Sequence, residues 1–395
     1  MRSSLSTSHA VYHRRGCGFQ CPRGVRSPGQ GCYSQQRMYL LLELAVALVV
    51  LAIVGFALWV TLWSKLLRQG FPFDEVETVT LSDGARIVLG HLKPRSDAAP
   101  LPPVMLCHGL AMNRHAFALD PERSLAARLA AEGRDVWVLE LRGAHPETRN
   151  AATHTSTFDS YVEVDVPEAI DFVCAATGAP EVDWIGFSMG GMLAYAYLGA
   201  LRGGRVRRLV TIGSPARFVR HPYRRFLALP GPLVSVAGRI RYTPFRLLAL
   251  VVAPLMLRRF PYRLTSGMRP WNYSTSMLRS AMANSFGDVP MGVALQFARW
   301  IHQGRFDSND GRRDYDAGLQ DIRVPMLVMV GSRDRLAPAG VALHAFEASG
   351  SSEKEFLEVG RASGAGREYD HLDLLLGAHA HDEVFPAVLD WLARR

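Results

Sequence analysis

The stretch Trp184–Gly191 (WIGFSMGG) decides how this 395-residue chain folds. An apolar strand pattern runs into Gly-x-Ser-x-Gly and continues as a helical pattern from Met192. Glycines beside the serine avoid the clashes that Cβ atoms would make in so tight a turn, and the helix that follows directs its first N–H groups toward an oxyanion. We interpret Ser188 as a nucleophile supported by Gly186 and Gly190; the alternative is a glycine-rich turn without chemistry.

A nucleophilic serine needs a carboxylate that orients its base. Val324–Val330 reads as a buried strand, and Gly331–Pro338 (GSRDRLAP) follows directly. Asp334 therefore comes just past a strand end, from where it can orient an imidazole at the same edge of a sheet. We predict Asp334 as the triad acid, the alternative being a turn-capping aspartate. Asp321 precedes the strand, at the opposite edge, and the aspartates at 307–316 fall in a polar stretch that we expect to be solvated.

The base is expected in the loop after the last strand, which we place at Glu355–Val359. His371 lies in that loop, before the chain enters its final amphipathic helix, and is the predicted base. His379 and His381 remain alternatives, although their position favours the surface or the start of the helix. Asp373 is expected to brace the histidine loop.

The order of strands and helices predicts an α/β fold. Residues 76–81 and 87–92 alternate around Ser82-Asp83-Gly84 and indicate a hairpin. Strands and helices then alternate, which predicts a mostly parallel, doubly wound sheet. The strands are expected at 104–107, 136–139, 182–186 and 209–212, and the helices at 121–132, at 162–177 and from 188, with Pro121 opening the first helix. Ser188, Asp334 and His371 each follow a different strand, so they should meet at the carboxyl edge of the sheet.

Three segments carry a resemblance to a known superfamily. Val104–Leu110 and Gly133–Gly143 are similar to a branch of the α/β-hydrolases that includes polyhydroxyalkanoate synthases and acid lipases, and His371–Asp373 (HLD) resembles the histidine motif of the acid lipases. The resemblance covers roughly residues 74–395. It implies an α/β-hydrolase fold with the order serine, acid, histidine. The polyester synthases use a cysteine nucleophile, so Ser188 favours ester hydrolysis over polymer synthesis.

The same resemblance suggests the oxyanion hole. His108-Gly109 follows the strand 104–107, where α/β-hydrolases turn the backbone toward the site. The backbone N–H groups of Leu110 and Met189 are then the expected donors. We expect His108 to brace this loop and not to act as the base.

A long insertion interrupts the alternation after Gly213-Ser214-Pro215. It contains apolar helical stretches at 247–257 and 293–301, and the resemblance implies a helical cap over the serine. We therefore expect the hydrolase core in two parts, 71–215 and 320–395, with the cap at 216–319.

The insertion is unusually basic. Between Asp183 and Asp288 the chain has sixteen arginines, no lysine and no acidic residue, with pairs at 207–208, 224–225 and 258–259 beside apolar stretches. One interpretation is that the genome favours arginine and that these residues lie on solvated helix faces. The other is that the insertion docks on anionic lipid headgroups. Nucleic acid is not an expected partner despite the net charge of +9, because the chain has no recognised binding motif.

Leu44–Trp63 contains no charged residue and is long enough to cross a bilayer as a helix. Trp59 and Trp63 lie near one end, as interface aromatics do. No small-residue cleavage site is evident, so we predict an uncleaved single-pass anchor at 38–64 rather than a signal peptide.

Residues 1–37 are predicted to be a disordered basic tail. Their arginines would keep the N-terminus in the cytoplasm, whereas a translation start at Met38 would leave Lys65 and Arg68 as the main charge bias and reverse the orientation. The membrane side of the enzyme therefore stays open. Cys17 and Cys21 lack a second ligand pair, so no metal site is expected.

The leading hypothesis is a membrane-anchored serine hydrolase that cleaves an ester, with an apolar acyl group or lipid as substrate, through a Ser-His-Asp triad and an acyl-enzyme. No metal or organic cofactor is required for this chemistry. An acyltransferase that uses the same residues with a lipid or thiol acceptor is one alternative. A non-catalytic scaffold that keeps the fold is the other.

Overall fold

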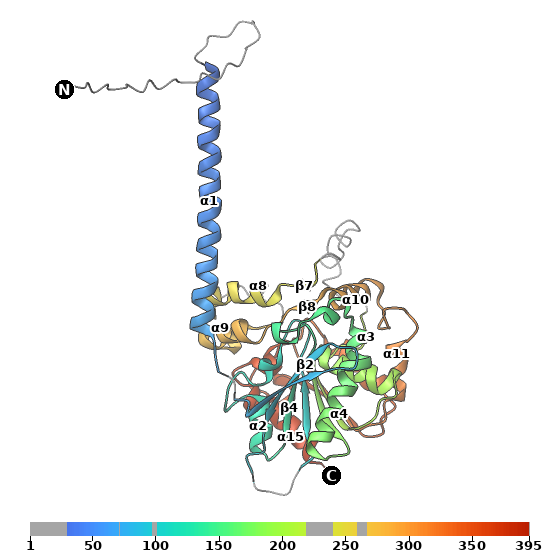
Figure 1. Ribbon diagram of the computed structural model, residues 1–395. Helices are drawn as coiled ribbons and strands as arrows, with labels where there is room; N and C mark the ends of the chain where they lie inside the picture. Colours follow the sequence, from blue (N-terminus) through green and yellow to red (C-terminus); the bar gives the residue numbers. More distant parts are fainter. Residues whose placement is uncertain (1–29, 71, 97–100, 219–239, 259–266, 395) are drawn as a thin grey trace, which may run out of the picture. The chain divides into compact units, whose positions relative to one another are not determined.

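The computed structural model describes residues 30–70, 72–96, 101–218, 240–258 and 267–394. The chain divides into two compact units, Met1–Leu58 and Trp59–Arg395. The second unit contains an eight-stranded sheet in the order β1-β2-β4-β3-β5-β6-β9-β10 (Figure 1). Its strands are β1 Glu75–Thr80, β2 Arg86–Leu92, β3 Val104–Cys107, β4 Val136–Glu140, β5 Val182–Phe187, β6 Val206–Ile212, β9 Met326–Gly331 and β10 Lys354–Val359.

The sheet is mostly parallel, as predicted. β2 pairs antiparallel with β1 and β4, and all the other pairs are parallel. Parallel neighbours need crossover connections, and helices supply most of them. These helices are α2 Leu125–Ala131, α4 Val166–Thr177, α5 Met189–Tyr195 and α12 Ala339–Ala348. A further helix, α15 Phe385–Ala393, follows the last strand and packs on the sheet. The central strands are continuous runs of apolar residues because helices cover both faces of the sheet.

Successive residues of each strand join different cores. On β3, Met105 and Cys107 pack with α4 and α5, whereas Val104 and Leu106 pack on the other face with α2 and α15. Every residue of β3, β4, β5 and β9 is buried. The carboxyl edge of this rigid sheet is therefore the platform on which the site is built.

The start of α2 differs from the prediction. The helix begins at Leu125, and Pro121 lies in the turn before it. Ser124 is the N-cap residue, with its hydroxyl accepting from the N–H of Ala127. Asp120 accepts from two backbone N–H groups in the preceding turn. Side-chain caps therefore decide the boundary, and the proline does not.

The insertion between β6 and β9 is largely helical within its described residues. The helices expected near 247–257 and 293–301 are α8 Phe245–Val252, with a short 3₁₀ turn after it, and α10 Met291–Gln303. The other described elements are β7 Tyr242–Thr243, α9 Thr275–Asn284, β8 Val289–Pro290 and α11 Tyr315–Gly318. Trp300 of α10 packs edge-on against Phe158 and Phe306, so α10 shares a core with the sheet.

One expectation about charged residues of this region is wrong: Asp307 is buried, and its side chain accepts from Trp300 Nε1 at 3.2 Å. The pair Arg207-Arg208 lies on β6, before the insertion. Arg207 binds Asp183, and Arg208 donates to main-chain carbonyls of α15. The pair 224–225 lies outside the described residues.

The N-terminal helix α1 spans Gln30–Leu67, so it begins before Met38 and ends after residue 64. Residues 30–37 of the predicted tail are therefore helical, and residues 1–29 lie outside the described part. The segment Arg37–Leu67, 31 residues long, is long and apolar enough to cross a membrane.

Candidate active site

Ser188 occupies a strained turn between β5 and α5. Its backbone dihedrals are φ 52° and ψ −114°, which a residue with a side chain rarely adopts. Close packing holds the turn. A Cβ atom on Gly190 would lie 2.1 Å from the carbonyl oxygen of Cys107, and one on Gly186 would lie 2.3 Å from the nitrogen of Gly191. The sequence motif thus corresponds to a backbone that only glycine permits on either side of the serine.

Asp334 and His371 are joined by a hydrogen bond. His371 Nδ1 lies 2.8 Å from Asp334 Oδ2. The other oxygen of Asp334 accepts from the backbone N–H groups of Leu336 at 2.9 Å and Ala337 at 2.7 Å. Both side chains are buried. The carboxylate is therefore fixed by the loop after β9, and it in turn orients the imidazole.

The imidazole of His371 lies beside the serine turn. Its ring packs on that of Phe187, the residue before Ser188, with ring centroids 4.9 Å apart. Gly213, which follows β6 with φ 62°, also lies close to the ring, and a Cβ atom there would lie 3.0 Å from His371 Nδ1. The strand ends of β5, β6 and β9 and the loop after β10 thus meet where the sequence placed the three residues.

The loop after β3 touches the serine. A Cβ atom on Gly109 would lie 3.0 Å from Ser188 Cβ. Within the described chain, neither the N–H of Leu110 nor that of Met189 donates a hydrogen bond to another residue. Both donors are thus available beside Ser188, and Met189 is at the first turn of α5.

His108 is built into the base of this loop. Its Nδ1 lies 2.9 Å from the carbonyl oxygen of Gly109, and its Nε2 accepts from the N–H of Leu141 at 3.2 Å. Burial lowers the pKa of His108 to about 4. A neutral ring that uses both nitrogens in main-chain contacts suits a brace and not a base.

The remaining histidines lie elsewhere. His379 precedes the short helix α14, Ala380–Glu383, and His381 Nδ1 lies 3.2 Å from the carbonyl oxygen of Arg123. Among the described residues, the histidine that pairs with Asp334 is His371, and neither His379 nor His381 does so.

Sequence reasoning missed Asp370, the residue before the histidine. Its carboxylate accepts from Arg335 Nε at 2.7 Å and from the N–H of His371 at 2.9 Å. Asp370 therefore ties the loop of His371 to the loop of Asp334. The acidic residue directly before His371 was the available signal.

Asp373 braces the histidine loop against the insertion. It accepts from Asn272 Nδ2 at 2.8 Å, from the N–H of Arg269 at 3.0 Å and from the N–H of Asp370 at 2.9 Å. Burial raises its pKa to about 6. Close by, the N–H of Leu372 donates to the carbonyl of Gly267 at 2.6 Å. The described part of the insertion is thus anchored directly at the site.

Comparison with curated proteins finds lipases and a polymerase. A Schizosaccharomyces pombe protein named as a probable lipase is 24% identical over 332 residues, which cover 73% of this chain and 66% of the relative. The polymerase subunit PhaC of Haloferax mediterranei is 24% identical, covering 78% and 62%. Human gastric triacylglycerol lipase is 23% identical, covering 82% and 88%. The chain thus spans slightly less than two thirds of the first two relatives.

Solved structures share the fold at low identity. An esterase from Thermogutta terrifontis matches 80% of this chain and 98% of its own, with a TM-score of 0.52 and 20% identity. A hydrolase from Pseudomonas aeruginosa PA01 matches 81% and 99%, with a TM-score of 0.53 and 18% identity. The family model described as the alpha/beta hydrolase fold matches residues 102–362. The chain therefore belongs to the alpha/beta hydrolase fold family, as predicted.

Proposed function

We propose that this protein is a membrane-anchored serine hydrolase that cleaves an ester with an apolar acyl group. Ser188 is the nucleophile, His371 the general base and Asp334 the acid that orients it. The observation that carries the proposal is the 2.8 Å contact between His371 Nδ1 and Asp334 Oδ2, with the histidine ring packed beside the strained turn of Ser188.

The reaction proceeds through an acyl-enzyme. His371 Nε2 takes the proton of Ser188 as Oγ attacks the ester carbonyl, and the oxyanion is held by the N–H groups of Leu110 and Met189. The imidazolium gives its proton to the departing alcohol. Water then attacks the acyl-serine as His371 accepts its proton, and the imidazolium returns a proton to Ser188 Oγ as the carboxylic acid leaves.

Two features support an apolar ester at a membrane. Several relatives are named lipases, two of them triacylglycerol lipases. In addition to α1, the insertion exposes large apolar side chains on and after α8. These are Phe245, Leu247, Leu248, Leu255 and Leu257, with arginines at 241, 246 and 258 around them. An apolar helix flanked by cations is suited to an anionic bilayer surface.

The test is active-site labelling of the full chain in mild detergent by a fluorophosphonate probe, with turnover of p-nitrophenyl esters of graded acyl length. Ser188→Ala should abolish labelling, and His371→Ala should lower kcat by at least about a thousandfold. His381→Ala is the matched control, because that residue is one of the two alternative bases. Free acid as the product distinguishes hydrolysis from acyl transfer.

Two results would overturn the proposal. One is a folded wild-type protein that neither labels nor turns over any ester. The other is activity that survives His371→Ala and is lost in His381→Ala.

A further inference from the structure

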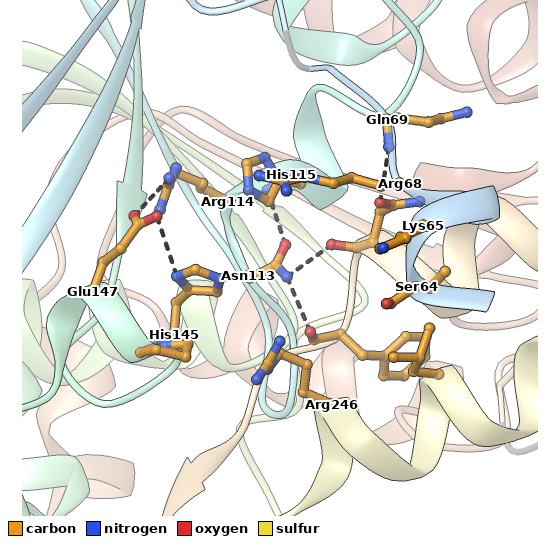
Figure 2. Close-up of a pocket in the computed structure, with 15 residues that line it drawn as sticks. Ser64, Lys65, Arg68, Gln69, Asn113, Arg114, His115, His145, Glu147 and Arg246 are labelled. Atoms are coloured by element: carbon orange, nitrogen blue, oxygen red, sulfur yellow. Dashed lines mark hydrogen bonds and ion pairs between the residues drawn. The ribbon is translucent and has the colours of Figure 1, made fainter. Parts of the chain in front are cut away.

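A cavity of about 650 Å³ lies at the C-terminal end of α1, within the unit Trp59–Arg395. The last turn of α1 and residues just after it form one wall, and α8, α9 and two short 3₁₀ segments, Arg114–Phe117 and Pro146–Thr148, contribute the rest. Figure 2 shows Lys65 and Arg68 across the cavity from His145 and Glu147. Ser188, Asp334 and His371 do not line it, so it is separate from the proposed catalytic site.

The cavity carries an excess of positive charge. Four of its lining side chains are cationic, namely Lys65, Arg68, Arg114 and Arg246, against the single carboxylate of Glu147. Arg114 is already neutralised, because it binds Glu147 at 2.9 Å and the buried Glu140 at 3.1 Å. The remaining three cations are therefore left to face the cavity.

These three cations lack strong partners. Neither Lys65 nor Arg68 forms an ion pair with another residue of the described chain. Arg246 Nε lies 4.0 Å from Asp288, whose carboxylate is already in closer contact with Arg149. The one lining carboxylate, that of Glu147, is already paired with Arg114. Cations held together in a concave site without a free carboxylate form a binding site for an anion, phosphate above all.

Hydrogen bonds hold the walls in place. Asn284 of α9 donates to the carbonyl of Leu67 at 2.8 Å and accepts from the N–H of Gln69 at 3.4 Å. Asn113 donates to the carbonyl of Asn284 at 2.8 Å (Figure 2), and Trp59 Nε1 lies 3.4 Å from the carbonyl oxygen of Val251, at the end of α8. The backbone that carries the cationic side chains is therefore already fixed, so the binding of an anion does not have to order this backbone.

The histidines of the cavity add no charge near neutral pH. Burial and the nearby Arg114 lower the pKa of His115 to about 2, and burial lowers that of His145. The positive potential therefore comes from lysine and arginine and persists at any physiological pH.

The position of the cavity along the chain suggests the source of the anion. Lys65 and Arg68 directly follow the apolar stretch Leu44–Trp63, and residues at the end of a membrane span lie at the level of lipid headgroups. Leu250 and Phe286 add apolar surface to the lining, against which a glycerol backbone can pack. We propose that this cavity binds the phosphate of an anionic phospholipid headgroup. The inference rests on the membrane anchoring of the proposed function.

The test is calorimetric titration of the full-length Ser188→Ala protein in mild detergent, so that ligand is not consumed. The probes are dihexanoyl phosphatidate, dihexanoyl phosphatidylcholine and inorganic phosphate. Phosphatidate should bind most tightly. Joint replacement of Arg68→Gln and Arg246→Gln should weaken its binding at least about tenfold, and Arg68→Lys with Arg246→Lys should restore most of it. The matched control is Arg202→Gln with Arg312→Gln, two exposed arginines outside the cavity.

Three outcomes would overturn the inference. Inorganic phosphate binding as tightly as phosphatidate would make the ligand a free anion, and equal binding of the zwitterionic phosphatidylcholine would remove the role of charge. An equal loss of phosphatidate affinity in the cavity pair and in the control pair of variants would show a general effect of net charge. Because the binding protein lacks the nucleophile, fluorophosphonate labelling of the parent protein reports separately on the proposed hydrolase activity.

Discussion

His371 is held by three carboxylates, each with a different task. Asp334 contacts the ring, Asp370 ties the loop to Arg335, and Asp373 ties it to Asn272 of the insertion. Only Asp334 contacts the imidazole, so the other two act as positioning residues. The orientation of the proposed base thus depends on contacts from the insertion and from the loop after β9.

Replacing Asp373 tests this positioning. In Asp373→Ala, the amide of Asn272 and two backbone N–H groups lose their buried acceptor, which should lower the free energy of unfolding by about 2–4 kcal/mol. Because the proposed triad itself is intact, kcat should fall only about 10- to 100-fold, far less than in His371→Ala. Denaturant unfolding and ester turnover measure the two effects. Asp390→Ala, an exposed site, should change neither; an Asp373→Ala protein that equals it would contradict the bracing role.

The buried His108 predicts a pH dependence of stability. Its pKa is about 4 in the folded protein and 6.5 when unfolded, so the unfolded state binds more protons between these values. Its contribution to stability is therefore complete above pH 6.5 and is lost as the pH falls toward 4. Between pH 7.5 and 4.5 the wild type should lose roughly 2–3 kcal/mol more than His108→Asn. Parallel loss in the two proteins, measured by denaturant unfolding, would show that His108 is not buried as a neutral ring.

At the scale of elements, the strand–turn–helix around Ser188 depends on two close backbone approaches. In Gly190→Ala the new methyl group would lie 2.1 Å from the carbonyl oxygen of Cys107, so α5 could not stay against β3. We expect more than about 3 kcal/mol of destabilisation and loss of labelling. Gly340 is the matched control, because it also lies early in a helix but has nothing within 4 Å of an added Cβ atom. Gly340→Ala should stabilise by up to about 1 kcal/mol; similar unfolding midpoints for the two variants would be contrary to this account.

The elements that sequence predicted well are those with local causes. Buried strands of a parallel sheet are continuous apolar runs, so β3, β5 and β9 could be read directly, as could the glycine-flanked turn at Ser188. The start of α2 was misplaced because the pattern gave Pro121 more weight than the capping hydroxyl of Ser124.

The contacts that could not be predicted join residues far apart in the sequence. Asn272 and Asp373 are separated by 101 positions, and Asn284 and Leu67 by 217. Neither pair has a local pattern, because an amide bonds a carboxylate or a carbonyl wherever the fold brings them together. The burial of Asp307 was missed for a different reason: its partner, the indole of Trp300, is only seven positions away, but the two meet across the turn that follows α10, which has no periodic pattern.

On the scale of the whole molecule, charge and apolar surface are distributed unevenly. The sixteen arginines between Asp183 and Asp288 exceed the net charge of +9, so the rest of the chain is net acidic. Some of these arginines have structural tasks in the sheet, as Arg207 and Arg208 do. Others surround the exposed apolar residues of α8 and the cavity at the end of α1. Function at a lipid surface would use these arginines and the exposed apolar residues together.

Removing residues 1–58 tests how the two units divide the work. Both cores of the sheet and the proposed triad lie within Trp59–Arg395, so that fragment should fold, label with the fluorophosphonate probe and lose the label in Ser188→Ala. The full chain should remain in the membrane pellet after alkaline carbonate extraction, because a spanning helix is held by its buried apolar length, whereas the fragment should be released. A full chain that carbonate releases would contradict the anchor, and a fragment that labels yet stays in the pellet would place the main membrane attachment in the insertion.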